Sequence, residues 1–476
     1  GWWWGGPESG KDGARALETL ALNDETKRVR LRWRESYIGV YRANQVLANI
    51  NNIELSEETK LQIEAEARFL RAFFYNALYR GYNNGSVIVH TTVPEMRTDF
   101  YKTPSPAQEE FALIKSDLEF SYLHLPRTYN ADEDQGRATW GAAAAMLGKL
   151  YINEHDYDTA KTYFKAILDS NDYSLTPHIG HNFNIENEMN SESIFEVAFS
   201  VEAKPGTSNG AADGPTGSEA TQRARSLATS EGGGYRVVMP SYHMTMLFQN
   251  DTMDVSNPVN AGRTGTSNYS IRTSYSIAMA DDDNTTLYQR SSDKGGGYNN
   301  KEASYLKKFQ NWWLERESEL SISGINERVI RLADVMLLYA ECILNTSGDY
   351  AEALVYVNQI RNRAGVELLD VANYDAESLM EHIMWVERPL ELMFEGFDLR
   401  WEDLTRWGKV KEQYDLLASK TYVISEKVLK AYDPSVHVGL TPVKEFVEAA
   451  DVYSTATHDY FPIPSTELNS NPDFFD

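Results

Sequence analysis

The stretch that decides the fold is Arg331–Gly365, RLADVMLLYAECILNTSGDYAEALVYVNQIRNRAG. Its apolar residues recur every three or four positions, first up to Ile343 and again from Ala353 to Ile360, which is typical of two amphipathic helices. Ser347 and Gly348 interrupt the pattern, and Gly365 can adopt the left-handed conformation that ends a helix. Two short antiparallel helices of this kind resemble one tetratricopeptide (TPR) unit of about 34 residues.

A second segment matches the same repeat more closely. Leu147, Gly148 and Tyr151 keep its L-G-x-x-Y spacing, and Ala160 and Phe164 keep its A-x-x-x-F spacing. Because one such unit leaves an apolar face open, it must stack on neighbours. We therefore expect a mainly α fold, in which TPR-like helical hairpins form an α-solenoid scaffold.

Composition excludes several classes of function. The chain has 476 residues, a net charge of -25 and 42% hydrophobic residues, so it can build a large core but offers no basic stripe for nucleic acid. Its one cysteine, Cys342, has no partner for a disulfide or a cysteine-based zinc site. No apolar run approaches the roughly 18 residues of a membrane span. Because the chain begins Gly1-Trp2 without a methionine, we expect a trimmed or processed product.

The pattern along the chain divides it into four segments. Helical periodicity stops after about residue 175, and Gly, Ser, Thr, Asn and Asp dominate from Lys204 to Asn300, which is too long for one loop. Within the later helical part, we expect single helices over residues 375–395 and 401–416. The expected segments are N-terminal TPR-like hairpins (1–175), an irregular Gly/Ser/Asn-rich ligand-binding lobe with short strands (176–327), C-terminal TPR-like hairpins (328–416) and a mixed segment that packs back on the scaffold (417–476).

Four motifs, in this order, resemble the SusD/RagB family of surface glycan-binding lipoproteins. They are Ala65-Glu66-Ala67-Arg68-Phe69-Leu70-Arg71-Ala72; Arg331-Leu332-Ala333-Asp334-Val335 with Tyr339-Ala340-Glu341 and Asn358-Gln359-Ile360-Arg361; Glu387-Arg388 with Phe394-Glu395-Gly396 and Arg400-Trp401-Glu402-Asp403-Leu404; and Phe461-Pro462-Ile463-Pro464 with Glu467, Leu468, Asn471 and Pro472. Together they span nearly the whole chain.

The chain departs from the family pattern at three places. Pro389 stands inside an expected helix and predicts a kink there. Phe397-Asp398-Leu399 looks like a short insertion, and we expect the helix that normally precedes the first repeat to be absent or cut away. The resemblance assigns the charged residues of the motifs to pairing across hairpins rather than to chemistry: Arg68, Arg71, Glu341, Glu387, Arg388 and Glu395.

The resemblance also implies a function. Proteins of this family capture oligosaccharide or polysaccharide without catalysis and pass it to a SusC-like TonB-dependent transporter barrel, as in a starch utilization system. They are lipoproteins of the cell outer membrane that face the extracellular side, so a lipid anchor would lie before Gly1. We expect no cofactor.

The candidate ligand-binding residues are aromatic rings in polar loops, together with their polar neighbours. A flat ring matches the apolar C–H face of a sugar, while amide and guanidinium groups match its hydroxyl edge. Rings held in Gly-rich loops fit this role better than rings on helices, which are usually core. The expected binding residues are Trp3, Trp4, Tyr288, Arg290, Tyr298, Asn299, Asn300 and Trp312.

Other chemistries leave weaker signals. Residues 206–210 match G-x-S-x-G, but a Gly/Pro loop follows where a hydrolase needs a helix. Residues 281–284 (Asp-Asp-Asp-Asn) offer oxygen ligands for calcium, without the spacing of an EF-hand. His178 and His181 lie near Glu186, where a solvated loop is favoured over a zinc site. An all-α glycoside hydrolase or lyase and a TPR peptide-binding adaptor stay open as alternatives.

Overall fold

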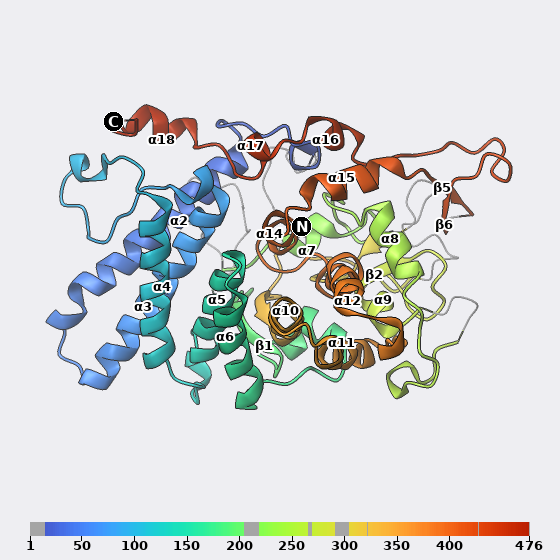
Figure 1. Cartoon of the computed structure of the whole chain (residues 1–476), viewed down its shortest axis with the longest axis horizontal. Helices are drawn as coiled ribbons and strands as arrows, with labels where there is room; N and C mark the ends of the chain where they lie inside the picture. Colours follow the sequence, from blue (N-terminus) through green and yellow to red (C-terminus); the bar gives the residue numbers. More distant parts are fainter. Residues whose placement is uncertain are drawn as a thin grey trace. The chain divides into compact units, whose positions relative to one another are not determined.

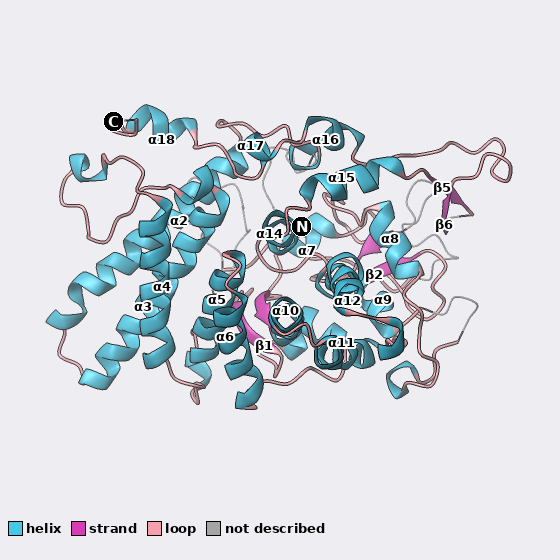
Figure 2. Ribbon diagram, in the orientation of Figure 1, coloured by secondary structure: helices cyan, strands magenta, loops and turns pink. Residues whose placement is uncertain are grey.

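The computed structural model describes residues 15–203, 219–264, 269–290, 304–320, 322–426 and 428–475. Contacts within the chain divide it into two units. Unit 1 comprises Gly1–Arg15 and Leu168–Asp451, and unit 2 comprises Ala16–Ile167 and Val452–Asp476. Helices dominate what is described, and the strands are short, as Figure 2 shows. The predicted fold class, a mainly α scaffold of TPR-like hairpins, is confirmed.

Unit 2 is built from helical hairpins. The helices α2, α3 and α4 pack side by side (Figure 1). Ser56 is the predicted N-cap of α3, and its hydroxyl accepts a hydrogen bond from the Thr59 amide at 3.1 Å. The helices assigned to this unit are α2 (Lys27–Asn49), α3 (Glu57–Gly81), α4 (Ala107–His124), α5 (Trp140–Asn153), α6 (Tyr157–Ser170, which runs three residues past the boundary), α17 (Thr455–His458) and α18 (Ser465–Ser470).

The pair α5 and α6 explains the L-G-x-x-Y and A-x-x-x-F spacings. Gly148 faces the ring of Phe164, and a Cβ placed on Gly148 would lie only 2.4 Å from that ring. Tyr151 of α5 stacks on Tyr163 of α6, with ring centroids 6.0 Å apart. A glycine is therefore needed where the second helix approaches the first.

In unit 1 the predicted hairpin is formed by α10 (Leu332–Thr346) and α11 (Tyr350–Ala364). Gly365 ends α11 with a φ of 72°, in the left-handed region expected from the sequence. Nearly the whole of α10 is buried, including Cys342. The buried residues include Asp334 and Glu341, whose carboxylates pair with Arg388 and Arg406.

The remaining elements of unit 1 are short. Its strands form antiparallel pairs, β1 with β4, β2 with β3, and β5 with β6. The helices are α7 (Arg223–Leu227), α8 (Tyr242–Gln249), α9 (Ile271–Ser276), α12 (Ala376–His382), α13 (Arg388–Leu392), α14 (Leu399–Arg406), α15 (Val410–Ser419) and α16 (Val447–Val452). The strands are β1 (Ser193–Val197), β2 (Ile277–Met279), β3 (Ser304–Leu306), β4 (Glu327–Arg331), β5 (Tyr422–Ser425) and β6 (Val428–Ala431).

Two expected helices differ from the structure. The helix over residues 375–395 contains a π-helical turn, η10 (Ile383–Glu387), directly before α13, and Pro389 lies in the first turn of α13. A proline lacks the amide hydrogen and crowds the preceding turn, and a widened turn relieves both problems. The expected helix 401–416 is two helices, because Gly408 adopts a φ of 65° between α14 and α15. Within the described residues, no helix combines the length and apolarity that crossing a membrane requires.

Candidate functional site

Five aromatic side chains from three separate segments of unit 1 form a continuous row. Tyr275 contacts His178 on one side and Trp312 on the other, with ring centroids 4.2 and 5.2 Å away and the planes nearly perpendicular. His181 stacks on His178 at 5.2 Å, and Trp313 meets Trp312 edge-on at 5.8 Å. We call these five residues the aromatic row. All five are half-buried, so each ring is anchored yet partly open to solvent.

The row rests on two buried clusters. Tyr275 and Trp313 pack against a core cluster that includes Phe183, and Trp312 packs against another that includes Tyr288. Burial lowers the pKa of His178 to about 4, helped by the charge of nearby His181, Arg363 and Arg263. The His178 imidazole is therefore neutral near pH 7 and adds an uncharged flat ring to the row.

A tight turn borders the row. Leu287 and Arg290 pair across it, and its two central residues, Tyr288 and Gln289, have φ values of 53° and 59°. Left-handed backbone at two successive non-glycine residues is costly and tends to persist where surrounding contacts or function demand it. The Tyr288 amide donates to the Trp312 carbonyl at 2.7 Å, and the exposed Gln289 side chain donates to the Trp313 carbonyl at 3.4 Å. The turn thus places an exposed amide beside the rings.

The structure corrects one expected site residue. Tyr288 was predicted to present its ring to a ligand, but it is only 1% exposed. Its hydroxyl donates to Gln310 and Glu317 at 2.8 and 2.9 Å, so the polar end of the ring is satisfied inside the protein. A ring enclosed in this way has no open face for a sugar. Its neighbour Arg290 is half-exposed and pairs with Glu231 at 2.6 Å.

Of the other expected residues, Trp312 belongs to the aromatic row. Trp3, Trp4, Tyr298, Asn299 and Asn300 lie outside the described residues, as do residues 206–210 of the G-x-S-x-G match. Their assignments stay predictions.

The residues 281–284 considered for calcium are engaged with the protein. Asp281 accepts hydrogen bonds from the hydroxyl of Tyr269 at 2.9 Å, and the buried Asp282 accepts one from Ser274. In the chain as far as it is described, no group of three or more His, Cys, Asp or Glu side chains is arranged to hold a metal ion.

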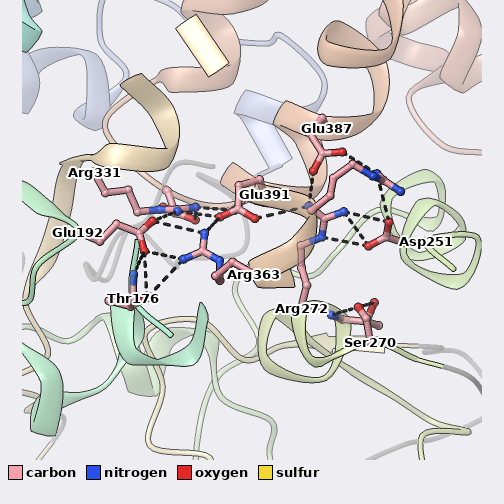
Figure 3. Close-up of polar contacts among 12 residues, drawn as sticks. Thr176, Glu192, Asp251, Ser270, Arg272, Arg331, Arg363, Glu387 and Glu391 are labelled. Carbon is pink, nitrogen blue, oxygen red and sulfur yellow. Dashed lines mark hydrogen bonds and ion pairs between the residues drawn. The ribbon is translucent and has the colours of Figure 1, made fainter. Parts of the chain in front are cut away.

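A buried network of ion pairs lies in the same unit (Figure 3). Arg331, the last residue of β4, reaches Glu192 at 2.6 Å and Glu391 at 2.7 Å, and Arg363 of α11 contacts the same two carboxylates. Burial alone would raise the pKa of Glu192, but the guanidinium groups of Arg363 and Arg331 outweigh it and hold the pKa far below its usual value. These carboxylates are therefore ionised and paired, as suits a scaffold rather than an acid–base catalyst.

The sequence prediction that six charged motif residues form ion pairs is confirmed. Each of the six residues contacts an opposite charge that is distant in the sequence. The pairs are Arg68 and Arg71 with Asp117, Glu341 with Arg406, Glu387 with Arg272 and Arg361, Arg388 with Asp334 and Asp403, and Glu395 with Lys308 and Arg331.

The network also fixes the segments that carry the aromatic row. Thr176, two residues before His178, donates from its amide and its hydroxyl to Glu192 at 3.1 and 3.0 Å. In α9, Arg272 precedes Tyr275 by one helical turn and pairs with Asp251 at 2.9 Å. Lys308, four residues before Trp312, pairs with Glu395 at 2.5 Å. The three segments are thus held by one rigid set of charges.

Comparison with known proteins identifies the family. The sequence profile of the SusD family matches residues 191–474, more than half of the chain. The chain belongs to the SusD family. A second profile, described as starch-binding associating with outer membrane, matches residues 14–152.

Related sequences agree with this membership. The SusD-family chain is 25% identical to SusD-like protein P25 of Formosa agariphila over 457 residues, which covers 92% of this chain and 77% of that protein. It is 23% identical to a SusD-like protein of Bacteroides ovatus, with coverage of 92% and 79%.

Solved structures share its fold. A SusD superfamily protein from Bacteroides vulgatus superposes with a TM-score of 0.77 at 24% identity, covering 97% of this SusD-family chain and 88% of that chain. A laminarin-binding SusD-like protein gives a TM-score of 0.67 at 22% identity, with coverage of 99% and 91%. Surface glycan-binding protein A from Bacteroides uniformis gives 0.67 at 20% identity, with coverage of 99% and 90%.

The expected binding residues include one member of the row, Trp312, and omit the other four. His178 and His181 were weighed only as metal ligands, and Tyr275 was not singled out. Tyr275 lies in the short helix α9, where an aromatic residue is usually read as core. The available signal was the His-x-x-His spacing: His178 is the N-cap of the 3-10 helical segment Ile179–Phe183, and His181 lies within that segment.

Proposed function

We propose that this protein binds an oligosaccharide or polysaccharide at the cell surface and delivers it, without cleaving it, to a SusC-like TonB-dependent transporter. The observation that carries the proposal is the aromatic row, five half-buried rings fixed by a buried ion network. Family membership supports carbohydrate binding, and two proteins of the same fold are described as laminarin-binding and surface glycan-binding.

The row suits a sugar for a physical reason. Each partly open ring offers an apolar face to the C–H groups of a pyranose, and the protein has already ordered these side chains, so little conformational entropy is lost on binding. The exposed amide of Gln289 and the guanidinium of Arg290 lie on the bordering turn, where they suit the hydroxyl edge. Among residues 291–303, Tyr298, Asn299 and Asn300 stay part of this proposal, and so do Trp3 and Trp4.

The test is binding to a polysaccharide panel that includes laminarin, starch and mannan, by affinity electrophoresis and calorimetry. We expect Trp312→Ala and Trp313→Ala to lose most of the affinity, measured well below the melting temperature of each variant, which should also fall because both rings pack against buried clusters. Tyr41→Ala is the matched control, since Tyr41 is a 38% exposed aromatic residue of unit 2. Binding that is unaffected by both tryptophan changes would refute the site.

The absence of catalysis is tested on the same samples. Prolonged incubation with each bound glycan is expected to release no new reducing ends. Appearance of reducing ends that depends on the protein would favour the glycoside hydrolase alternative. We also expect chelation with EDTA to leave the affinity unchanged, because Asp281 and Asp282 are engaged by Tyr269 and Ser274.

The location and the partner are tested in cells. We propose that a lipid anchor preceding Gly1 holds the protein on the outer leaflet of the outer membrane, facing outward. Surface labelling of intact cells and co-purification with a TonB-dependent barrel from detergent-solubilised outer membranes are the expected results. Recovery of the chain only from the soluble fraction would refute this part.

A further inference from the structure

A buried lysine lies against the centre of the aromatic row. Lys307 follows β3, and its amide donates to the carbonyl of Ser276 at 3.0 Å, which extends the pairing of β2 with β3 by one residue. The side chain is fully buried. Its amine nitrogen lies 3.4 Å from the centre of the Trp312 ring and 5.6 Å from that of Tyr275. It donates to the hydroxyl of Thr285 at 2.5 Å.

This placement is costly and calls for an explanation. Fully buried lysines are rare because the ammonium loses its hydration. The charged groups that face the amine are Asp282, whose carboxylate favours the ammonium, and Arg263, whose guanidinium opposes it. Burial outweighs the carboxylate and lowers the pKa of Lys307 well below that of an ordinary lysine. A methionine of similar length would fill the space without this cost.

The geometry around the amine suits an anchor for the indole. In its protonated form, the amine over the face of a tryptophan is attracted by the negative face of the ring, so this attraction acts at pH values below the lowered pKa of Lys307. The hydrogen bond to Thr285 fixes the direction of the amine, and Tyr275 meets Trp312 edge-on at 80°. Lys307 lies over one face of the Trp312 ring, and Trp312 as a residue keeps part of its surface open to solvent.

We propose that Lys307 is a positioning residue, which holds the rings of Trp312 and Tyr275 in the orientation that receives a sugar. It touches no ligand itself and acts through the indole. The part of this inference that concerns the sugar rests on the proposed function, whereas the anchoring of the indole does not.

The test uses Lys307→Met, which removes the amine and keeps the apolar stem, and Thr285→Val, a milder change that removes the hydrogen bond to the amine. The first readout is the affinity for laminarin by calorimetry. We expect Lys307→Met to weaken binding about tenfold and Thr285→Val to weaken it less. Both changes act because the rings of Trp312 and Tyr275 are held less firmly, and neither removes a direct contact with the sugar. Affinity equal to that of the wild type in both variants would overturn the proposal.

The second readout is the fluorescence of Trp312, obtained as the difference between each protein and its Trp312→Phe counterpart. In the wild type, we expect this emission to titrate below the pH at which free lysine deprotonates, because the charge beside the indole disappears. This pH dependence should be absent in Lys307→Met. Lys307→Arg should restore the positive charge beside the indole and give an emission that does not change with pH over the same range. An emission that is the same in Lys307→Met and wild type at every pH would overturn the anchoring.

The two readouts separate this inference from the proposed function. A wild-type protein that binds no glycan of the panel refutes the function, and the fluorescence then decides the anchoring alone. In a third outcome, the wild type binds laminarin, and the variants melt at a lower temperature but keep the affinity and the pH-dependent emission of the wild type. This outcome assigns Lys307 to core packing and overturns the inference.

Discussion

Replacing one buried carboxyl in unit 2 should raise the stability of the protein, and the gain should depend on pH. Glu110 of α4 is 0% exposed, and within the described residues neither of its carboxyl oxygens has a hydrogen-bond partner. The phenols of Tyr37 and Tyr75, whose pKa values its charge helps to raise, are already bound to the backbone of Ile88 and His90. Burial raises the pKa of Glu110 to about 9.

The sign and size of the stability change follow from the difference between the pKa of Glu110 in the folded and in the unfolded protein. A carboxyl whose pKa is raised by folding favours the folded state fully below about pH 4.5, and the advantage is lost as the pH rises toward 9. At pH 7 the unfolded chain is ionised while the folded chain stays protonated, over a gap of about 2.5 pH units. At about 1.4 kcal/mol per unit, this costs the wild type about 3.5 kcal/mol. Glutamine has the shape of the protonated acid without this cost.

The assay is urea unfolding of wild type and Glu110→Gln between about pH 4.5 and 8. We expect equal stability at the acidic end and a gain that grows by about 1.4 kcal/mol per pH unit. Glu109→Gln, an exposed neighbour on the same helix, is the control and should show no such slope. A difference between Glu110→Gln and wild type that is constant with pH would refute the reasoning, because it would mean that Glu110 does not titrate on unfolding.

Three further changes test the packing and the site. Glu192→Gln leaves the guanidinium of Arg363 without its full charge partner and should cost about 3–5 kcal/mol in urea unfolding, with weaker laminarin binding, because the network fixes the row. Gly148→Ala forces a Cβ against Phe164 and should cost about 1–3 kcal/mol, measured the same way. Tyr288→Phe should cost about 1–3 kcal/mol by removing the hydroxyl that donates to the buried amide oxygen of Gln310, while laminarin affinity stays that of the wild type. A Tyr288→Phe protein of full stability and reduced affinity would restore Tyr288 to the binding surface.

The scaffold was predictable because its signals are local. The periodicity of Arg331–Gly365 defines two helices, and the glycine that ends the second one adopts the conformation its residue type favours. The spacing of Gly148 and Phe164 reports a close approach between two helices that are neighbours in the chain. In each case the partner lies within one repeat, so residue type and spacing are enough.

The breaks inside helices were less predictable, because the backbone can accommodate a residue that does not fit an α-helix in more than one way. Pro389 was expected to kink its helix, and the structure shows a widened, π-helical turn directly before α13. At Gly408 the periodicity of the flanking segments continues, yet the left-handed glycine separates two helices. The sequence shows that a residue at such a position disfavours a continuous α-helix, but tertiary packing decides which backbone conformation replaces it.

The binding surface depends on contacts between distant segments. For this reason the composition of the polar loops was not enough to predict which of their aromatic residues are exposed. Tyr288 and Trp312 lie in similar polar stretches and are joined by a backbone hydrogen bond, yet one is enclosed and the other half-exposed. The difference comes from Gln310 and Glu317, whose side-chain oxygens accept hydrogen bonds from the Tyr288 hydroxyl. These bonds offset the cost of burying that hydroxyl. An aromatic residue in a polar loop is therefore a binding candidate only if the fold does not supply a buried partner for its polar end. The indole of Trp312 meets a different buried neighbour, Lys307, which lies over one face of the ring, and Trp312 stays half-buried. Carbohydrate recognition in this chain would then depend on what lies beneath each ring, which only the assembled lobe reveals.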